Sequence, residues 1–220
     1  GLKSHCAMRN NGTNLFFVTG LPRSRTAWLA NFFSCGAAHC LHDGLADAGN
    51  PERLVENVEA LLGSFYYAGD SDSGLLPYAG RIVELCPAAR WLHVIRPLAE
   101  VEASCAAAFA GKSPYRIGGL EVDVAPGALR LALAILAEHG EQLRLTVRSV
   151  NPHGYLRINF ADLNREEVIR MAWAHLVPAA PFPTARWELL RHLRVTMIPG
   201  RRNMEAHHAR ELAGAIFKEH

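Results

Sequence analysis

The sequence has no apolar run that approaches the roughly 20 residues needed to cross a membrane as a helix. Its first residues, GLKSHCAMRNNGTN, lack the apolar block of a signal peptide. A formal net charge of only +2 is far from the strong basic excess that is typical of nucleic-acid-binding proteins. We therefore expect a cytoplasmic protein that binds neither a membrane nor nucleic acid.

Disulfide and metal-site patterns are also missing. The five cysteines are an odd number, widely spaced and without a C-x-x-C pair, which predicts buried free thiols in a reducing compartment. They are Cys6, Cys35, Cys40, Cys86 and Cys105. His207 and His208 lack the spacing of a metal-binding pair with a convergent carboxylate, so no metal is expected.

The chain shows no internal repeat, low-complexity segment or linker, which favours one domain over residues 1–220. Apolar runs rich in β-formers alternate with segments of helical periodicity, and this alternation predicts an α/β fold. We expect three layers, with a central parallel sheet between helices, as in P-loop NTPases. The expected strands are 15–18, 38–42, 64–68, 91–95 and 155–160. The expected helices are 24–33, 51–62, 75–86, 97–109, 125–149 and 165–176, with two more around 197–202. A glycine-containing surface segment is expected at 112–124.

The first strand leads into the most informative segment, NLFFVTGLPRSRTAWLANFF. The run 15–18 ends at Gly20, and helical spacing begins after Ser24. The free N–H groups of a helix N-terminus can hold a phosphate or sulfate. Arg23 and Arg25 add positive charges whose donors suit anionic oxygens. Together these features indicate an anion cradle.

The Walker pattern of P-loop kinases and NTPases is not satisfied. Counted from Gly20, the positions of the second glycine, the lysine and the magnesium-binding hydroxyl hold Arg25, Thr26 and Ala27. Phosphoryl transfer needs that lysine and that hydroxyl. A kinase-like phosphotransferase is therefore only an alternative.

The loop instead resembles that of another family. Residues 22–28, PRSRTAW, resemble the Pro-Lys/Arg-Ser-Gly-Thr-Thr-Trp loop of sulfotransferases that use 3′-phosphoadenosine 5′-phosphosulfate (PAPS). The resemblance implies that this loop binds the cofactor, through Gly20, Pro22, Arg23, Ser24, Arg25, Thr26, Ala27 and Trp28. Arg25 and Ala27 depart from the pattern, and Arg25 would cost backbone energy if the loop required a positive φ there.

A second match lies further along the chain. Family members hold the 3′-phosphate with an arginine at a strand end and a serine eight residues later, and Arg96 and Ser104 have this spacing. Two helical turns return the serine to the same helix face. A late basic segment often covers the adenosine in this family, and Arg201 stands in such a segment.

The catalytic base is less clearly indicated. Sulfuryl transfer needs a group that takes a proton from the acceptor and cationic groups such as Arg23 that stabilise the leaving oxygen. Members use a His or a Glu at different places. Here His42 or Asp43, after the second strand, is the favoured base, with Asp70 and Ser71 as positioning groups and Asp72 nearby. The plain alternative is that HDG is a turn and GDSDSG a polar loop.

The sequence thus predicts a sulfotransferase that moves a sulfuryl group from PAPS to a hydroxyl or amine of a small-molecule or glycan acceptor. No metal is expected in this reaction, and a homodimer is a possible assembly. The alternatives are the phosphotransferase and a non-catalytic protein that binds a nucleotide or anion. Ligands of parallel sheets bind at the carboxyl ends of strands, where Gly20, Asp43, Asp70 and Arg96 are expected.

Overall fold

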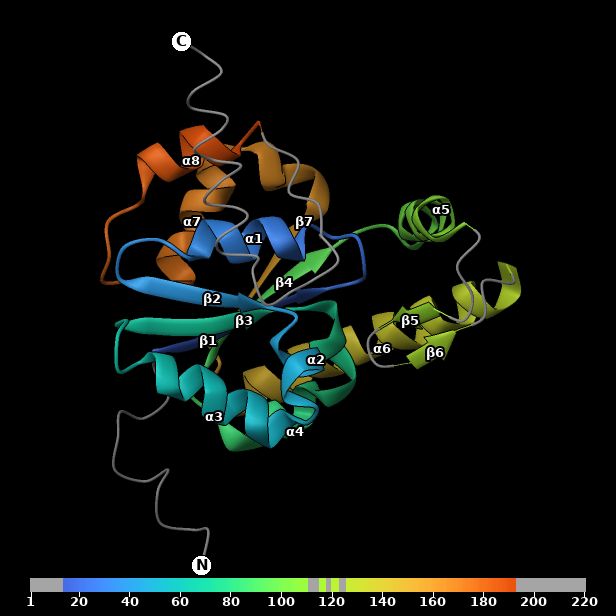
Figure 1. The fold of residues 1–220 in the computed structure, drawn as a ribbon, viewed down its shortest axis with the longest axis horizontal. Helices are drawn as coiled ribbons and strands as arrows, with labels where there is room; N and C mark the ends of the chain where they lie inside the picture. The colour runs from blue at the N-terminus through green and yellow to red at the C-terminus, as the bar shows by residue number, and fades with distance from the viewer. Residues whose placement is uncertain (1–13, 111–114, 118–119, 123–125, 193–220) are drawn as a thin grey trace, which may run out of the picture.

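The computed structural model describes residues 14–110, 115–117, 120–122 and 126–192. Five parallel strands form a sheet in the order β2-β3-β1-β4-β7 (Figure 1). Their bounds are Leu15–Gly20 (β1), Ala38–His42 (β2), Tyr67–Ser71 (β3), Arg90–Ile95 (β4) and Tyr155–Asn159 (β7). The predicted α/β fold is confirmed, and the strand order is that of a P-loop-like sheet. The order reverses at β1, so β1 ends at the switch point where ligands of such sheets bind.

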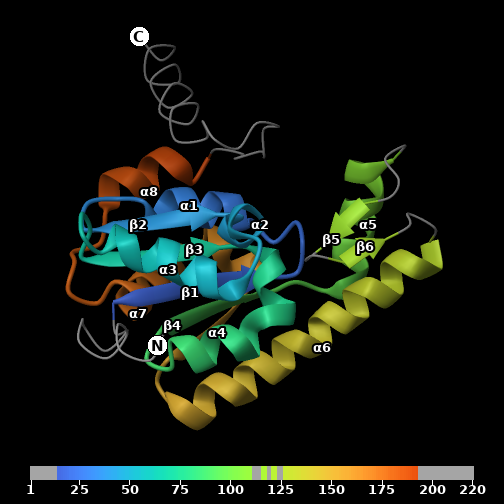
Figure 2. The same cartoon turned by 60° about the horizontal axis from the view of Figure 1, so that its bottom comes forward.

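Helices cover both faces of the sheet, as the alternation predicts (Figures 1 and 2). One face carries α1 (Thr26–Phe33), α7 (Glu166–Leu176) and α8 (Thr184–Leu190), and the other carries α2 (Gly44–Ala48), α3 (Pro51–Leu61), α4 (Ala79–Leu85) and the long α6 (Pro126–Val150). Local signals start α3 as expected: Pro51 is its first residue, and the Asn50 side chain accepts a hydrogen bond from the N–H of Arg53 at 2.8 Å. Among the described helices, none is both long enough and apolar enough to cross a bilayer.

The central strand β1 is buried over its whole length. Alternate residues serve two apolar clusters, because successive side chains of a strand point to opposite faces. Phe17 packs against Trp91 on the α6 side, with ring centroids 4.9 Å apart, while Phe16 packs against Phe33 on the α1 side. Burial on both faces explains why the strand has a continuous apolar run.

A smaller unit lies beyond the carboxyl ends of the strands (Figure 1). It consists of α5 (Leu98–Phe109) and an antiparallel pair, β5 (Tyr115–Ile117) and β6 (Leu120–Val122), which lies beside α6. The sequence predicts α5 but only a surface segment for residues 112–124. Two 3₁₀ segments, η1 (Ser73–Tyr78) and η2 (Phe160–Asn164), follow β3 and β7 near the same edge.

Two predicted boundaries are wrong. The third strand is 67–71 and not 64–68, because the N–H groups of Ser64 and Phe65 turn back to the Leu61 carbonyl and close α3. As a result, Asp70 lies inside the strand and not in a loop after it. The predicted helix 75–86 is split into η1 and α4 around Pro77, which has no N–H to donate. The predicted helices around 197–202 lie outside the described residues.

Candidate active site

The loop after β1 begins at a tightly packed glycine. A Cβ atom on Gly20 would lie 2.6 Å from the Val94 carbonyl oxygen of β4 and 3.3 Å from the Ser24 Cβ. No side chain fits in that space, so Gly20 is required for the approach of β1 to β4. The observed role of Gly20 is therefore to place the loop at the junction of the two strands.

Arg23 and Arg25 both adopt left-handed backbone conformations, with φ of 66° and 63°. The sequence anticipates this cost for Arg25, because the sulfotransferase loops that it resembles have glycine at that position. The Arg25 guanidinium is half-buried: its Nη1 donates to the Asn164 Oδ1 at 2.7 Å, and its Cζ lies 5.0 Å from the centre of the Trp28 ring. Arg25 therefore links the loop to η2, and desolvation lowers its pKa.

The backbone strain at Arg25 can be measured with two variants that both remove the guanidinium. We expect Arg25→Gly to be more stable to denaturation than Arg25→Ala by about 1 kcal/mol, because only glycine adopts φ near +63° without a Cβ clash. The measurement is urea unfolding of both proteins. Equal stability would show that the backbone at residue 25 relaxes when the side chain is shortened.

A buried hydroxyl group lies in the middle of the loop. Ser24 is 0% exposed, and its Oγ has no hydrogen-bond partner in the described structure. The first turn of α1 begins next to it and has no side-chain cap. Uncapped N–H groups together with an unsatisfied hydroxyl suit the oxygens of a phosphate or sulfate. The residues present thus fit the expected 5′-phosphosulfate.

The remaining loop residues contact protein. The Thr26 carbonyl accepts a hydrogen bond from the Ser71 hydroxyl at 2.8 Å, which ties the start of α1 to β3. Pro22 and Ala27 are buried. Trp28 is 2% exposed, and its Nε1 donates to the Leu190 carbonyl in α8 at 2.9 Å. In this structure the Trp28 indole belongs to the core, with Arg25 over its face.

The second predicted motif meets the loop. The Arg96 Nη1 donates to the Arg23 carbonyl at 2.7 Å, and the Arg23 Nε lies 3.5 Å from the Ser104 Oγ. Burial raises the pKa of neighbouring Cys105 to about 11, although the positive charges of Arg23 and Arg96 act in the opposite direction. Two arginines and a serine from separate parts of the chain therefore gather at the carboxyl ends of β1 and β4.

Neighbouring side chains hold Arg96. Its Cζ lies 4.1 Å from the centre of the Phe160 ring, and its Nε lies 3.3 Å from the Glu100 Oε2. Only 15% of the Arg96 side chain is exposed, compared with 55% for Glu100. The guanidinium is thus held by the ring, the loop carbonyl and the exposed carboxylate of Glu100.

The predicted base candidates form an acidic group at the ends of β2 and β3. The His42 Nδ1 lies 3.5 Å from the Asp43 Oδ2, and Asp43 has a φ of 56°. Burial, and then the charge of nearby Asp43, raise the Asp72 pKa to about 7. Asp70 accepts the Gly44 N–H on Oδ1 at 3.1 Å, and its Oδ2 has no hydrogen-bond partner in the described structure. Burial, and then the charge of Asp72, raise the Asp70 pKa well above its usual value.

These positions correct part of the sequence interpretation. The acidic residues of GDSDSG are not a solvated loop: Asp70 is 0% exposed and Asp72 is 6% exposed. Asp70 supports the backbone after β2, because it bonds the Gly44 N–H and has no exposed surface. The sequence interpretation gave no role to Phe160 or Asn164, and it named Asp72 only as a neighbour of Asp70 after the third strand. Arg201 lies outside the described residues.

Among the described cysteines, Cys40, Cys86 and Cys105 are buried as predicted, whereas Cys35 is half-buried. Cys35, Cys40, Cys86 and Cys105 are free, as predicted, and Cys6 lies outside the described residues. Burial raises the Cys40 pKa well above its usual value. Within the part of the chain that the structure describes, no group of three or more His, Cys, Asp or Glu side chains could hold a metal ion.

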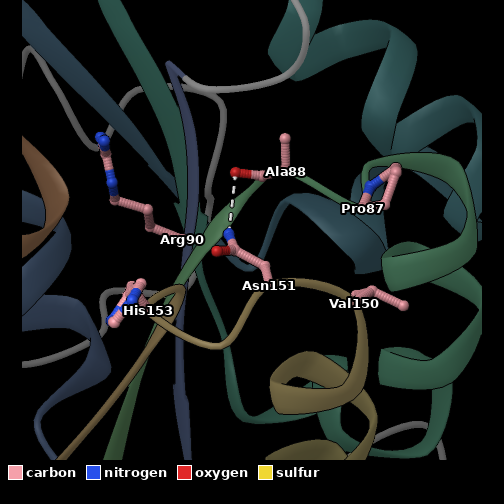
Figure 3. A pocket seen from close by; sticks show the side chains of 6 residues that line it. All are labelled: Pro87, Ala88, Arg90, Val150, Asn151 and His153. Atoms are coloured by element: carbon pink, nitrogen blue, oxygen red, sulfur yellow. Dashed lines mark hydrogen bonds between the residues drawn. The ribbon is translucent and has the colours of Figure 1, made fainter.

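A separate depression lies at the other end of β4 (Figure 3). Its volume is about 440 Å³, and it is lined by Pro87, Ala88, Arg90, Val150, Asn151 and His153. The Asn151 Nδ2 donates to the Ala88 carbonyl at 3.3 Å, so this polar group is used to hold the turn before the strand. Arg90 begins β4 and Arg96 follows it, so the depression is not part of the anion cradle.

Comparisons with known proteins agree with the fold. No protein-family model matches the sequence, and no curated protein matches it. Among solved structures, the chain is similar to a sulfotransferase from Alicyclobacillus acidocaldarius, with a TM-score of 0.52, 14% identity and coverage of 91% of this chain and 92% of that chain. The sulfotransferase domain from the curacin biosynthetic pathway gives a TM-score of 0.48 and 13% identity over 84% of this chain and 80% of that chain. At this level of identity, the first likeness shows that the chain has the fold of a bacterial sulfotransferase.

Proposed function

We propose that the protein is a PAPS-dependent sulfotransferase. The observation that carries the proposal is the meeting of two motifs that lie 73 residues apart, where the Arg96 guanidinium donates to the Arg23 carbonyl of the loop. Each motif alone is a weak signal, because an arginine after a strand is often only an ion-pair partner. Their contact, next to the unsatisfied Ser24 hydroxyl, supports a site for a nucleotide with charged groups at both the 3′ and 5′ positions.

In this proposal, Ser24, Arg23 and the N–H groups at the start of α1 bind the 5′-phosphosulfate. Arg96 and Ser104 bind the 3′-phosphate. Arg25 contributes positive charge to the cradle while its side chain holds the loop to Asn164. Thr26 and Ala27 contribute their backbone N–H groups. Ala27 has no side-chain hydroxyl, but a backbone donor does not need one.

PAPS, when bound, supplies the sulfuryl group: the acceptor oxygen or nitrogen bonds to sulfur, the bond from sulfur to the 5′-phosphate oxygen breaks, and adenosine 3′,5′-bisphosphate leaves with that electron pair. Asp43, paired with His42, takes the proton from the acceptor hydroxyl or amine. Arg23 stabilises the negative charge that develops on the leaving oxygen. The acceptor class stays as the sequence predicts, a small molecule or a glycan.

The assignment of the 3′-phosphate site gives a direct binding test. Adenosine 3′,5′-bisphosphate is expected to bind without metal and more tightly than AMP, because only the bisphosphate engages Arg96 and Ser104. Arg96→Ala should lose about 1.5–3 kcal/mol of bisphosphate binding, the usual strength of a hydrogen bond to a charged group, and little AMP binding. Isothermal titration calorimetry without divalent cations measures all four affinities.

The matched control is Arg90→Ala, which removes an arginine from the other end of the same strand. Its two affinities should equal those of the wild type. Equal affinity of the wild-type protein for bisphosphate and AMP would remove the 3′-phosphate assignment. Magnesium-dependent ATP hydrolysis by the wild-type protein would support the phosphotransferase alternative instead.

A further inference from the structure

The two residues proposed to bind the 3′-phosphate have a carboxylate between them. Arg96 comes just before α5, Glu100 lies in the first turn of this helix, and Ser104 lies one turn later. Residues four apart in a helix lie on the same face, so Glu100 and Ser104 share one side of α5. The negative charge of Glu100 thus stands between the two groups to which an anion is assigned.

The contacts of Arg96 use both edges of its guanidinium. The Nε lies 3.3 Å from the Glu100 Oε2, the Nη1 donates to the Arg23 carbonyl at 2.7 Å, and the Phe160 ring covers one face. A guanidinium binds a phosphate most strongly through two neighbouring N–H groups, Nε with Nη2 or Nη1 with Nη2. Each of the two contacts takes one member of such a pair, so a bidentate contact with phosphate requires that one of them is given up.

The contact with Glu100 is the easier of the two to replace. The Glu100 side chain is exposed, and an exposed ion pair between residues four apart contributes little to stability. The Arg23 carbonyl belongs to a loop whose backbone has a φ of 66° at this residue and follows the tightly packed Gly20. Moving that carbonyl would disturb the anion cradle itself. The carboxylate of Glu100 is therefore the partner of Arg96 that an incoming phosphate displaces.

We infer that Glu100 is an internal competitor of the 3′-phosphate: its carboxylate holds the Arg96 Nε in the free protein, and the 3′-phosphate of a bound nucleotide replaces it. The inference rests on the proposed function, which assigns this phosphate to Arg96 and Ser104. Only hydrogen bonds and an ion pair are exchanged, so no covalent bond forms or breaks. Because PAPS and its product share the 3′-phosphate, the same carboxylate weakens the binding of both and favours release of the product.

The first test compares nucleotides that differ only in where the phosphate is attached. Calorimetry at about 0.1 M salt, where distant charges are screened, gives the affinities of adenosine 3′,5′-bisphosphate, adenosine 3′-monophosphate and AMP. Glu100→Gln keeps the length of the side chain and removes its charge. It should tighten binding of the bisphosphate and of the 3′-monophosphate by about three- to fivefold, the strength of an exposed ion pair. The affinity for AMP should stay within about twofold, because AMP has no group for Arg96.

The matched control is Glu102→Gln. Glu102 lies on the same helix, but its Oε2 is paired with the Arg130 Nε of α6 at 3.4 Å, so this variant removes the same charge without touching Arg96. Its affinities for the three nucleotides should equal those of the wild type. Unchanged or weaker binding of the bisphosphate in Glu100→Gln would overturn the inference, and so would an equal gain for AMP, which would indicate a general effect of charge.

The second test asks whether the effect of Glu100 acts through Arg96. It repeats the bisphosphate titration with Arg96→Ala and with the double variant Arg96→Ala/Glu100→Gln. These two proteins should agree within about twofold, because without the guanidinium only the repulsion between Glu100 and the ligand remains. A gain as large as in the wild-type background would overturn the competition for Arg96. The Tm of each variant shows that it is folded at the temperature of the titration.

Transfer of radiolabel from PAPS to a pool of hydroxylated and amine acceptors reports on the proposed function separately. If the wild-type protein transfers nothing but Glu100→Gln shows the gain for 3′-phosphates, the competition at Arg96 is supported and the sulfotransferase function is overturned. If the wild-type protein transfers the label but the gain is missing, only the role of Glu100 is overturned. The failure of this inference and the failure of the proposed function therefore give different results.

Discussion

Asp43→Asn is expected to lower the rate of sulfuryl transfer by about 10²–10⁴ while leaving nucleotide affinity unchanged. The amide keeps the shape of the side chain but cannot take the acceptor proton. In the proposed site, the cofactor is bound by Arg23, Ser24 and Arg96, which belong to the loop after β1 and the end of β4. The measurements are transfer of radiolabel from PAPS at saturating donor and calorimetric binding of adenosine 3′,5′-bisphosphate.

Companion variants locate the base if Asp43 is not the group responsible. His42→Ala should also lower the rate, because the imidazole lies 3.5 Å from the Asp43 Oδ2. Asp47→Asn, an exposed carboxylate on α2, serves as the control and should transfer normally. Rates near wild type in both Asp43→Asn and His42→Ala would show that neither residue is the base. A rate loss confined to Asp70→Asn would move the base to β3.

Trp28→Ala is expected to destabilise the folded protein by about 3–5 kcal/mol, the usual cost of truncating a large buried aromatic side chain. The Trp28 ring stacks on Phe32 at 5.5 Å, meets the edge of Trp187 at 6.1 Å and ties α1 to α8 through the Leu190 carbonyl. The alanine variant would leave a cavity in this cluster and an unpaired carbonyl. Chemical denaturation monitored by far-ultraviolet circular dichroism gives the free energy of unfolding.

Trp28→Phe separates the structural role from contact with the cofactor. The smaller ring keeps most of the packing and loses the bond to Leu190, so we expect a smaller loss of stability and normal nucleotide affinity. The resemblance to sulfotransferases places this tryptophan at the cofactor instead. A clear loss of nucleotide affinity in Trp28→Phe at nearly unchanged stability would favour that role and imply that Arg25 moves off the ring on binding.

The altered loop also has a consequence for charge. Arg25 stands where the sulfotransferase loops that this one resembles have glycine, and its guanidinium contacts Asn164 and the Trp28 ring. Arg23 is exposed and Arg96 is fixed beside it, so these two side chains remain to face an incoming anion. The departure from the family pattern therefore changes how the loop is held in place and leaves the positive charge of the cradle intact.

Local patterns in the sequence determined the fold class and several element boundaries of this protein. The apolar run 15–18 predicts a strand buried on both faces, and Asn50-Pro51 predicts the start of α3, because each depends on only a few neighbouring residues. The spacing of Arg96 and Ser104 puts the serine about two helical turns beyond the arginine, because α5 begins directly after Arg96-Pro97. The alternation of strands and helices suffices for a parallel α/β sheet, since short connections leave few other topologies.

The tertiary structure decided which of these groups meet. Only the strand order puts β3 between β2 and β1, and that position buries Asp70 and brings Asp72 to Asp43. The Arg25 guanidinium is held by Asn164, a residue 139 positions later in the chain, and Trp28 packs against Trp187 of α8. Such contacts depend on how distant segments pack, and the free energy of that packing is set by the whole core and not by a local pattern. The sequence therefore predicts the candidate residues, and the fold determines which of them lie together.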